Sequence, residues 1–188
     1  MAYIGLAYPT FAKLDPETNT YSDGFRMGKA VSTSINVNYN EAKLAGDNII
    51  AEETKEFRDG TMDLGITTIP IEAYSTVFGH EVTEVEDKGT KIVDKTDDVP
   101  NYVGVGLVKE ELVDGKKSYI AMWFKKCLFT ESGESAQTKG ETITFQTPTI
   151  TGSILALDDK TWRERFVFDK ESDAIEYINE QAGITPEA

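Results

Sequence analysis

The side chains most able to do chemistry in this sequence are carboxylates gathered in one acidic stretch. They are Glu41, Asp47, Glu52, Glu53, Glu56, Asp59 and Asp63. Two carboxylates placed across a sugar cleft can hydrolyse a glycosidic bond, but Tyr39 and Phe57 are the only aromatic residues of this stretch that could line such a cleft. A helix–loop–helix calcium site needs acids at alternating positions with a central glycine and a closing glutamate, and the segment "GDNIIAEE" lacks that order. We therefore interpret the acids as a solvated face.

His80 and Cys127 are the single histidine and the single cysteine of the chain. His80 has no second nitrogen ligand for a metal and no nucleophile near it in sequence, so we expect an exposed structural residue instead of a catalytic base. Cys127 ends an apolar strand, where a small buried thiol is expected, whereas a reactive thiol needs a basic and exposed setting. The residues therefore point to no enzyme activity, and they imply no metal or cofactor.

The composition predicts one soluble domain spanning residues 1–188. The length suits a single domain of ~100–200 residues, and 39% of the residues are hydrophobic. The formal charge of −14 opposes binding to a phosphate backbone, because such binding depends on Lys and Arg. The first residues lack a basic start followed by an apolar run, and nowhere do ~18 apolar residues follow one another. We expect a protein made and folded in the cytosol, with no membrane association.

Alternating apolar and polar residues predict an antiparallel β-protein. Residues 30–37 and 61–68 alternate cleanly, which is typical of half-buried strands. Residues 101–109 and 117–128 predict a hairpin around the Asp-Gly pair at 114–115, the strongest short-range hairpin signal. A charge-rich, exposed hairpin is expected within residues 81–100, with its turn at 87–89. Further strands are expected through the following residues: Ile143, Phe145, Ile150 and Ile154, with an interruption at Pro148, and Trp162, Phe166 and Phe168.

The strand over residues 117–128 is apolar on both faces. Tyr119, Ala121 and Trp123 are expected on one face. The other face is expected to hold Ile120, Met122, Phe124 and Leu128. A strand covered on both sides lies inside a sandwich or places one face against another subunit.

Two short helices are expected. Pro70 and Gly79 bound the first, and its expected apolar face holds Ile71, Tyr74 and Phe78. For the second, Asp173 and Glu176 resemble a capping box, Gly183 stops the helix, and Ile175, Ile178 and Ala182 form its apolar stripe. With eight or nine strands, these elements predict an antiparallel β-sandwich or barrel with one or two short α-helices. Residues 184–188 are expected to form a flexible tail.

Residues 38–60 form the longest connection between two expected strands. Connections of this length are uncommon in compact domains, and they tend to be functional or disordered. Leu44, Ile49 and Ile50 lie within it, and a disordered segment has no need of such aliphatic residues. We expect an ordered loop that packs against something, such as another copy of the chain.

Several blocks of the sequence together resemble one protein family. They are "MAYIGLAYPTFAKLD", "GKAVSTSINVNYNEAKLAGDN", "DGTMDLGI", "FGHEV" followed by "DKG", "PNYVGVGLV" and "AQTKGETITFQTPTITGSI". In their order and spacing they resemble the major tail proteins, or tail tube proteins, of long non-contractile-tailed phages and prophages of Gram-positive bacteria. The resemblance covers nearly the whole chain.

The resemblance implies a β-sandwich of the phage tail tube type and a structural role in the virion. Copies of the chain would assemble into hexameric rings that stack into a tube, and DNA would pass through the acidic lumen during ejection without specific binding. The implied partners are the chain itself and other tail proteins: the tape measure, distal tail and terminator proteins. The implied location is the virion tail, after assembly in the host cytoplasm.

By the same resemblance, residues 38–60 become an inter-strand loop that reaches a neighbouring subunit. Its expected assembly residues are Tyr39, Leu44, Gly46, Asp47, Ile49 and Ile50. The alternative from a different class is a monomeric β-sandwich that binds carbohydrate or calcium. Self-association in solution separates these two readings.

Overall fold

The protein is built mainly from antiparallel β-strands, as the alternating patterns predict. The computed structural model describes residues 2–47, 49–131, 133, 138 and 147–185, and strands make up 62% of it. The strands are β1 (Ala2–Asp15), β2 (Thr20–Arg26), β3 (Ala30–Gly46), β4 (Ile49–Ile66), β5 (Glu81–Val85), β6 (Gly89–Val93), β7 (Tyr102–Val113), β8 (Lys116–Thr130), β9 (Thr149–Leu155) and β10 (Arg163–Phe168). The helices are α1 (Ile71–Thr76) and α2 (Glu171–Ala182).

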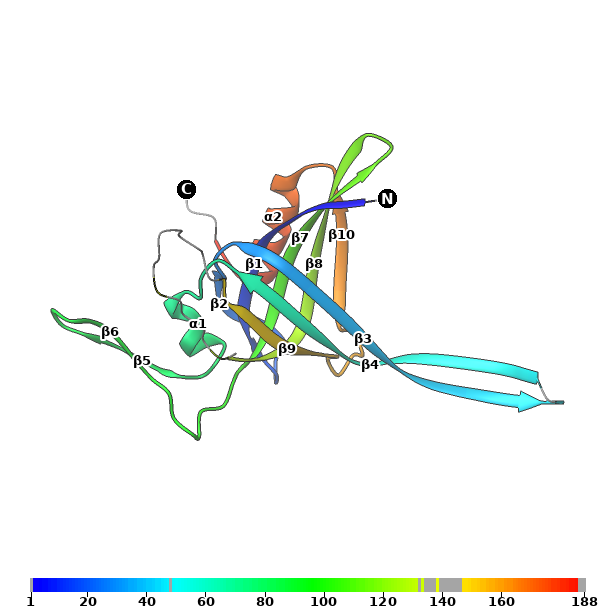
Figure 1. Ribbon diagram of the computed structural model, residues 1–188, viewed down its shortest axis with the longest axis horizontal. Coiled ribbons are helices and arrows are strands. Elements are labelled where there is room, and N and C mark those ends of the chain that lie inside the picture. The colour runs from blue at the N-terminus through cyan, green and yellow to red at the C-terminus, as the bar shows by residue number, and fades with distance from the viewer. Residues whose placement is uncertain (1, 48, 132, 134–137, 139–146, 186–188) are drawn as a thin grey trace.

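Eight of these strands form one sheet that branches at β8. The strands follow the order β2-β1-β7-β8-β9-β4-β3, and β10 also pairs with β8. Residues 119–124 of β8 pair with β10, whereas residues 126–130 pair with β9. The exchange of partner turns the sheet, so that β9, β4 and β3 cross over the layer made by β2, β1, β7, β8 and β10 (Figure 1).

The main hydrophobic core fills the space between these two layers. Met62 and Leu64 of β4 and Ile154 of β9 contribute from the crossing layer, and Phe11 of β1 and Phe124 of β8 contribute from the other. All five side chains are fully buried. The arrangement is that of a β-sandwich in which both layers belong to one continuous sheet.

An irregularity in β8 changes which residues face this core. The β7–β8 register shifts between Val103 and Val105, so β8 carries an extra residue where it changes partner. Met122 and Phe124 face the core before this point, and Cys127 and Phe129 face it afterwards. The expectation that Leu128 shares a face with Phe124 is therefore wrong, because a β-bulge reverses the alternation of side chains.

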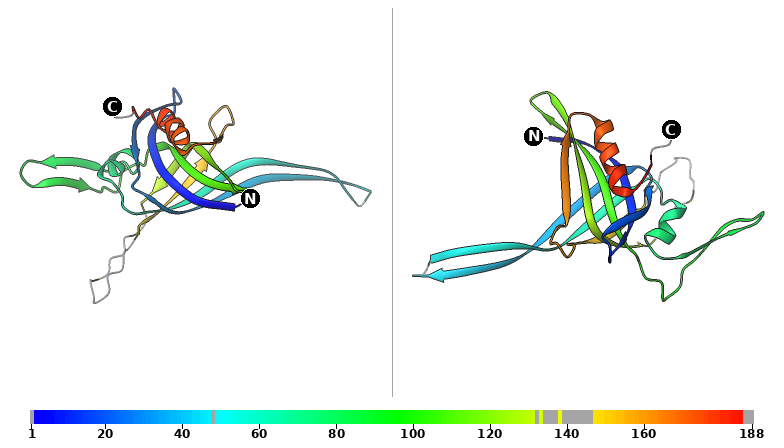
Figure 2. Two further views of the ribbon diagram at one scale, coloured as in Figure 1. Left: turned by 90° about the horizontal axis from the view of Figure 1, so that it is seen from above. Right: turned by 180° about the vertical axis from the view of Figure 1, so that it is seen from behind.

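Helix α2 covers the outer face of the sheet. Ala174, Ile178 and Ala182 are fully buried and pack in a second core with Trp123 and Ala121 of β8. In Figure 2 (right), α2 lies across β7 and β8 on the side opposite β3 and β4. The second apolar face of β8 is therefore covered by the chain's own helix, so of the two alternatives, burial within the chain is found and not a subunit contact on this face.

The close fit of α2 requires glycine on β7. A Cβ added to Gly106 would lie 2.5 Å from Ile178 Cγ2, and one added to Gly104 would lie 2.4 Å from Trp123 Cζ2. Both distances are shorter than a van der Waals contact. The backbone of β7 is thus free of side chains where the indole ring and the helix approach it.

The sequence predicts the C-terminal end of α2 correctly and the capping of its N-terminal end wrongly. Gly183 ends the helix in the left-handed conformation at φ +68, as expected. The helix begins at Glu171, its N-cap is Lys170, and no side chain caps it, so the expected capping box at Asp173 is wrong. Ile184, expected in a flexible tail, donates its backbone N–H to the Asn179 carbonyl and packs against the second core. Residues 186–188 lie outside the described residues.

Helix α1 closes one end of the sandwich. Pro70 stands at its N-cap, and Gly79 follows it at φ +77. Ala73 and Phe78 are buried in the main core, whereas Ile71 is 49% exposed. Tyr74 packs against the main core and Phe78 is buried in it, as expected, although Phe78 lies beyond the helix end at Thr76. The expected face is wrong at Ile71, the first residue of the helix.

Two hairpins follow the turn signals closely. β5 and β6 pair across the expected turn, where Asp87 and Gly89 have φ values of 60 and 106. β7 and β8 pair across Asp114 and Gly115, with φ values of 49 and 79. In the β7–β8 hairpin both central residues have positive φ, which is what a type I′ turn requires.

Residues 38–60 are a β-ribbon and not the loop that we expected. β3 and β4 pair from Ala30 to Gly46 and from Ile49 to Ile66, with Asp47 at φ +50 in the turn. Both faces of the outer part are exposed to solvent. Because neither face is buried, apolar and polar residues need not alternate there, and the pattern that predicts a strand is missing. The ribbon projects far beyond the sandwich, opposite the β5–β6 hairpin (Figure 1).

The first two strands had no counterpart among the expected elements. β1 pairs with both β2 and β7, but its register against β7 shifts twice, once between Ala7 and Thr10. Tyr8 has φ +58 at this irregularity, and Pro9 follows. These features interrupt the alternation by which a strand is recognised. Of the strand expected through Ile143 to Ile154, residues 143 and 145 lie outside the described residues, and β9 begins directly after Pro148.

We predict that α2 is an integral part of the fold. Replacing Ile178 with Ala leaves a cavity between α2 and Trp123, so the free energy of unfolding should fall by about 2–5 kcal/mol. Denaturant titration measures this change. Glu176→Ala, on the exposed side of α2, is the control and should change stability by about 0.5 kcal/mol or less. Equal stability of the two variants would mean that α2 docks only loosely.

Candidate functional site

The most prominent feature outside the cores is the outer part of the β3–β4 hairpin, residues 39–57, which we call the arm. All described side chains of residues 40–45, 47, 49–50 and 52–56 are exposed. Seven residues of extended chain separate Tyr39 from Gly46, which gives a reach of roughly 20–25 Å at ~3.3 Å per residue. In both views of Figure 2 the arm extends away from the remaining strands.

The base of the arm is fixed to the sandwich by aromatic stacking. The ring of Phe57 stacks on Trp162 with centroids 4.4 Å apart and an interplanar angle of 3°. Tyr39 pairs with Phe57 across the ribbon. Just inside this point, the Asn38 amide donates to the Asp59 carboxylate, and Arg58 Nε lies 2.7 Å from Asp59 Oδ2. The direction in which the arm leaves the body is thus set by its own side chains.

The two faces of the arm differ in charge. Directly paired residues share a face of a ribbon. On one face, Lys55 Nζ lies 2.8 Å from Glu41 Oε1 and 3.3 Å from Glu53 Oε1, and Lys43 Nζ lies 3.6 Å from Glu53 Oε1. The hydrogen bond from Lys55 lowers the pKa of Glu41. This face neutralises its own charges.

The opposite face of the arm carries acids that form no ion pair with a described cation. The register places Leu44 opposite Glu52, Asn40 opposite Glu56 and Gly46 opposite Ile49. Neither Glu52 nor Glu56 forms an ion pair among the described residues. We call this the acidic face of the arm. It combines unpaired carboxylates with aliphatic side chains.

The tip of the arm is apolar on both faces. Leu44 and Ile49 are 61% and 68% exposed, and Ile50 on the opposite face is 59% exposed. Ile50 changes face relative to Ile49 because successive side chains of a strand alternate. Clustered exposed aliphatic residues at the end of an ordered projection indicate a surface that another molecule covers.

Five of the six site residues expected from sequence lie together at the tip. Leu44, Gly46, Asp47, Ile49 and Ile50 surround the turn, whereas Tyr39 lies at the base beside Phe57. The stack of Phe57 on Trp162 was not among the contacts expected from the sequence. The spacing of the two residues, more than a hundred positions apart, carries no signal that pairs them.

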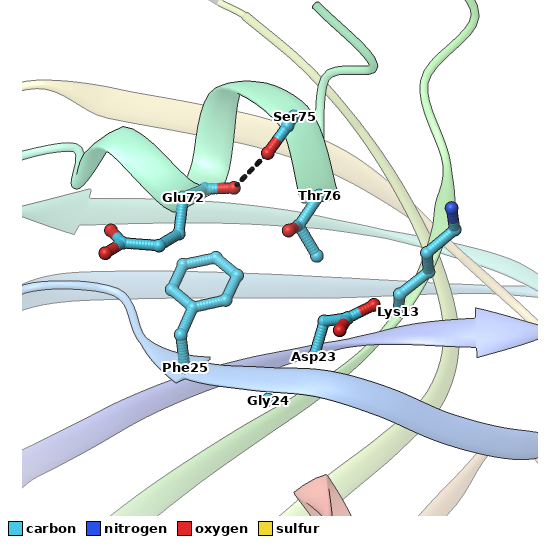
Figure 3. A pocket seen from close by; sticks show the side chains of 7 residues that line it. All are labelled: Lys13, Asp23, Gly24, Phe25, Glu72, Ser75 and Thr76. Carbon is cyan, nitrogen blue, oxygen red and sulfur yellow. Dashed lines mark hydrogen bonds between the residues drawn. The ribbon is translucent and has the colours of Figure 1, made fainter. Parts of the chain in front are cut away.

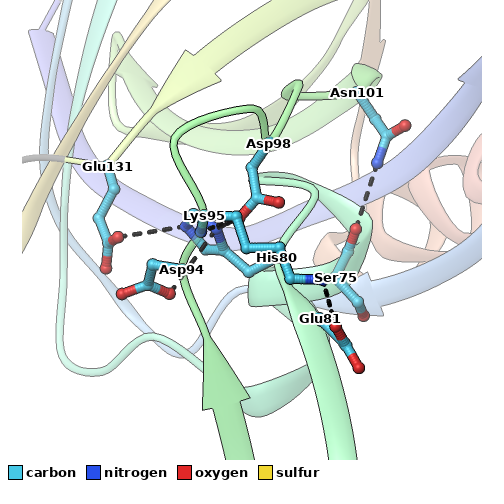
Figure 4. Close-up of polar contacts among 8 residues, drawn as sticks. All are labelled: Ser75, His80, Glu81, Asp94, Lys95, Asp98, Asn101 and Glu131. Atoms are coloured by element: carbon cyan, nitrogen blue, oxygen red, sulfur yellow. Dashed lines mark hydrogen bonds and ion pairs between the residues drawn. The ribbon is translucent and has the colours of Figure 1, made fainter.

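His80 is the centre of a second polar cluster (Figure 4). Its Nδ1 lies 2.7 Å from Asp98 Oδ2 and 3.7 Å from Asp94 Oδ1, and its Nε2 lies 3.4 Å from Glu131 Oε2. The imidazole is only 13% exposed, so the expectation of an exposed residue is wrong. The cluster ties the segment after α1 to the base of the β5–β6 hairpin and to the end of β8.

The charges around His80 favour its protonated form. Burial by itself lowers the pKa of His80, but the hydrogen bond to Asp98 and the negative charges of Asp94 and Glu131 outweigh burial and raise the pKa above its ordinary value. The same hydrogen bond, with one from the Lys95 backbone N–H, lowers the pKa of Asp98. Among the described residues, the side chains that form these ion pairs with the imidazole are all carboxylates.

The remaining features that could do chemistry are the single cysteine and one surface depression. Cys127 is fully buried, as expected, and burial raises the pKa of its thiol. A depression of about 500 Å³ lies between α1 and the β1–β2 hairpin (Figure 3), lined by the following residues: Lys13, Asp23, Gly24, Phe25, Glu72, Ser75 and Thr76. Ser75 Oγ in this depression donates to the Glu72 carbonyl oxygen. No base stands against this hydroxyl in the hydrogen bonds of the described residues.

Among residues that the structure describes, no group of three or more His, Cys, Asp or Glu side chains is arranged to hold a metal ion. Neither described helix has the length and apolarity that crossing a bilayer requires.

Comparison with known proteins was made for the whole chain. A scan against protein-family models gives no match. A search of curated proteins gives no match either.

We predict that the His80 cluster stabilises the fold more in mild acid than in alkali. Because the folded-state pKa of His80 is raised, its contribution is fully present below the unfolded pKa of about 6.5 and is lost as the pH rises through the folded value. Unfolding of the wild type and of His80→Gln, measured at pH 5.5 and 8.5, should differ more at pH 5.5. A difference that is independent of pH would mean that folding leaves the pKa of His80 unshifted.

Proposed function

We propose that this chain is a structural virion protein whose copies assemble into stacked hexameric rings that form a phage tail tube. The observation that carries the proposal is the arm: an ordered ribbon whose tip exposes Leu44, Ile49 and Ile50 and which no described part of its own chain covers. The resemblance of the sequence blocks to tail tube proteins is the second support. The mainly β fold is compatible with both.

The size of the apolar tip favours assembly by many simultaneous contacts. Full burial of one aliphatic side chain contributes about 1.5–3 kcal/mol. Bringing two proteins together costs about 4–15 kcal/mol in lost freedom of motion. Three tip residues therefore roughly offset the cost of one association and leave little surplus. A closed ring, in which each copy both gives and receives a contact, supplies the additional contacts that stable association needs.

The net charge suits a conduit for DNA. A charge of −14 on each copy is multiplied in a ring, and carboxylates that face the lumen repel the phosphate backbone. A basic wall would instead bind the duplex by releasing its counterions. DNA then passes without specific binding. The proposed protein partners are other copies of the chain and the tape measure, distal tail and terminator proteins that the resemblance implies.

We predict that charging the tip blocks assembly and leaves the fold intact. The variant Ile49→Asp with Ile50→Asp replaces two exposed aliphatic residues, so its stability should stay within about 0.5 kcal/mol of the wild type. The concentration at which polymers form should rise at least about a hundredfold, because a loss of ~3 kcal/mol of burial corresponds to that factor. Sedimentation and negative-stain electron microscopy measure polymer formation.

The matched control places the same two charges on the other projecting hairpin. Thr83 and Thr90 are exposed on β5 and β6, and Thr83→Asp with Thr90→Asp should assemble as the wild type does. Tubes formed by the tip variant at wild-type concentration would contradict the proposal. So would a wild-type chain that remains monomeric at every concentration, also when purified tail proteins that initiate tubes are present.

A further inference from the structure

The inner face of the sandwich layer carries a group of cations in a strongly acidic protein. Lys109 of β7 and Arg163 and Arg165 of β10 make up this group, which we call the cation cluster. In the register, Lys109 pairs with Ile120, Arg165 with Met122 and Arg163 with Phe124. Since Met122 and Phe124 face the main core, the three cations lie on that same face of the sheet.

No acid neutralises the cation cluster among the described residues. None of its three members forms an ion pair there, although ten other contacts of that kind exist. Partial burial lowers the pKa values of Lys109 and Arg163, and repulsion from Arg165 lowers them further. Glu111 lies on the same face two residues beyond Lys109, but it is only 8% exposed. The cations therefore present a net positive patch.

Aromatic and aliphatic side chains complete this patch. The Arg163 guanidinium lies over the Trp162 ring at 4.3 Å, and Lys109 Nζ lies 5.1 Å from the centre of the Tyr3 ring. Tyr3 and Val167 are 64% and 60% exposed. In Figure 1 the upper parts of β7, β8 and β10 extend beyond the point where β3 crosses them.

The acidic face of the arm has the complementary chemistry. It offers Glu52 and Glu56 without cation partners, beside the exposed Leu44 and Ile49. A patch of unpaired cations with apolar neighbours therefore has its counterpart on the same chain. In the structure the arm extends away from the body (Figure 1), with its base held by the stack of Phe57 on Trp162. The complementary surfaces are thus placed to meet between two copies.

We propose that the acidic face of the arm of one copy docks on the cation cluster of the next copy, with the apolar tip lying against the exposed end of the β7–β8–β10 layer. This inference rests on the proposed self-assembly and names the two surfaces that meet. The contact joins different surfaces of two identical chains, so it repeats from copy to copy and generates a ring or a filament. Each copy contributes one arm and one cluster.

Charge reversal tests this pairing. The arm variant is Glu52→Lys with Glu56→Lys, and the cluster variant is Lys109→Glu with Arg165→Glu. Arg163 is left unchanged because it packs over Trp162 and Phe124. Each variant should raise the concentration needed for assembly by at least about tenfold, because like charges then meet in the interface. Thermal unfolding confirms that each variant is folded.

Restoration distinguishes a direct contact from general electrostatics. An equimolar mixture of the two variants, and a single chain that carries all four changes, should assemble at close to the wild-type concentration, because every arm then meets a cluster of opposite charge. The matched control, Glu84→Lys with Glu86→Lys on the β5–β6 hairpin, changes the net charge equally and should have no effect. Raising the salt concentration should weaken wild-type assembly.

The outcomes separate this inference from the proposed function. Tubes formed normally by both charge-reversed variants would overturn the docking and leave the tail tube proposal standing. A wild-type chain that never associates would overturn both. If the cluster variant assembles normally but loses binding to a labelled DNA duplex that the wild type binds, the cluster is a polyanion site and the docking is overturned.

Discussion

The exchange of hydrogen-bonding partner along β8 is the feature on which the rest of the structure depends. A strand has only two edges, and β8 uses one edge for β7 along its length and divides the other between β10 and β9. This division lets one sheet form both layers of a sandwich. It also sets where β3 and β4 cross, and therefore where the arm leaves the body and which part of the inner face stays uncovered.

The sequence predicts those parts of the fold in which the structure favoured by neighbouring residues is also the structure that the surrounding packing requires. Asp114-Gly115 forms the expected turn, Gly183 ends α2, and Ile178 and Ala182 are buried as their spacing predicts. Leu128 is an exception because a β-bulge reverses the alternation from which a buried face is inferred, and the bulge leaves no signal in the neighbouring residues. Ile71 is an exception because it stands at the exposed first position of α1.

The sequence predicts the residues of the candidate site, but it does not predict that they form a β-ribbon. Leu44, Ile49 and Ile50 are conspicuous in an acidic segment, because aliphatic residues have no use in a disordered connection. A ribbon in solvent needs no apolar face, so its pairing depends on cross-strand contacts such as Lys55 with Glu41, which strand patterns do not reveal. The cation cluster was missed because Lys109 and Arg163 come from strands far apart in sequence, and only the pairing of β7 and β10 with β8 brings them together.

The register shifts between β3 and β4 mark the points at which the arm can bend. One shift lies between Asn38 and Tyr39, where the ribbon leaves the sandwich, and another lies between Leu44 and Ala45, beside the tip. Such irregularities bend and twist a two-stranded ribbon at defined points. In the proposed assembly, these joints would absorb changes of angle between neighbouring copies while each sandwich stays rigid. A long filament built in that way would bend at its connections, and its walls would keep their shape.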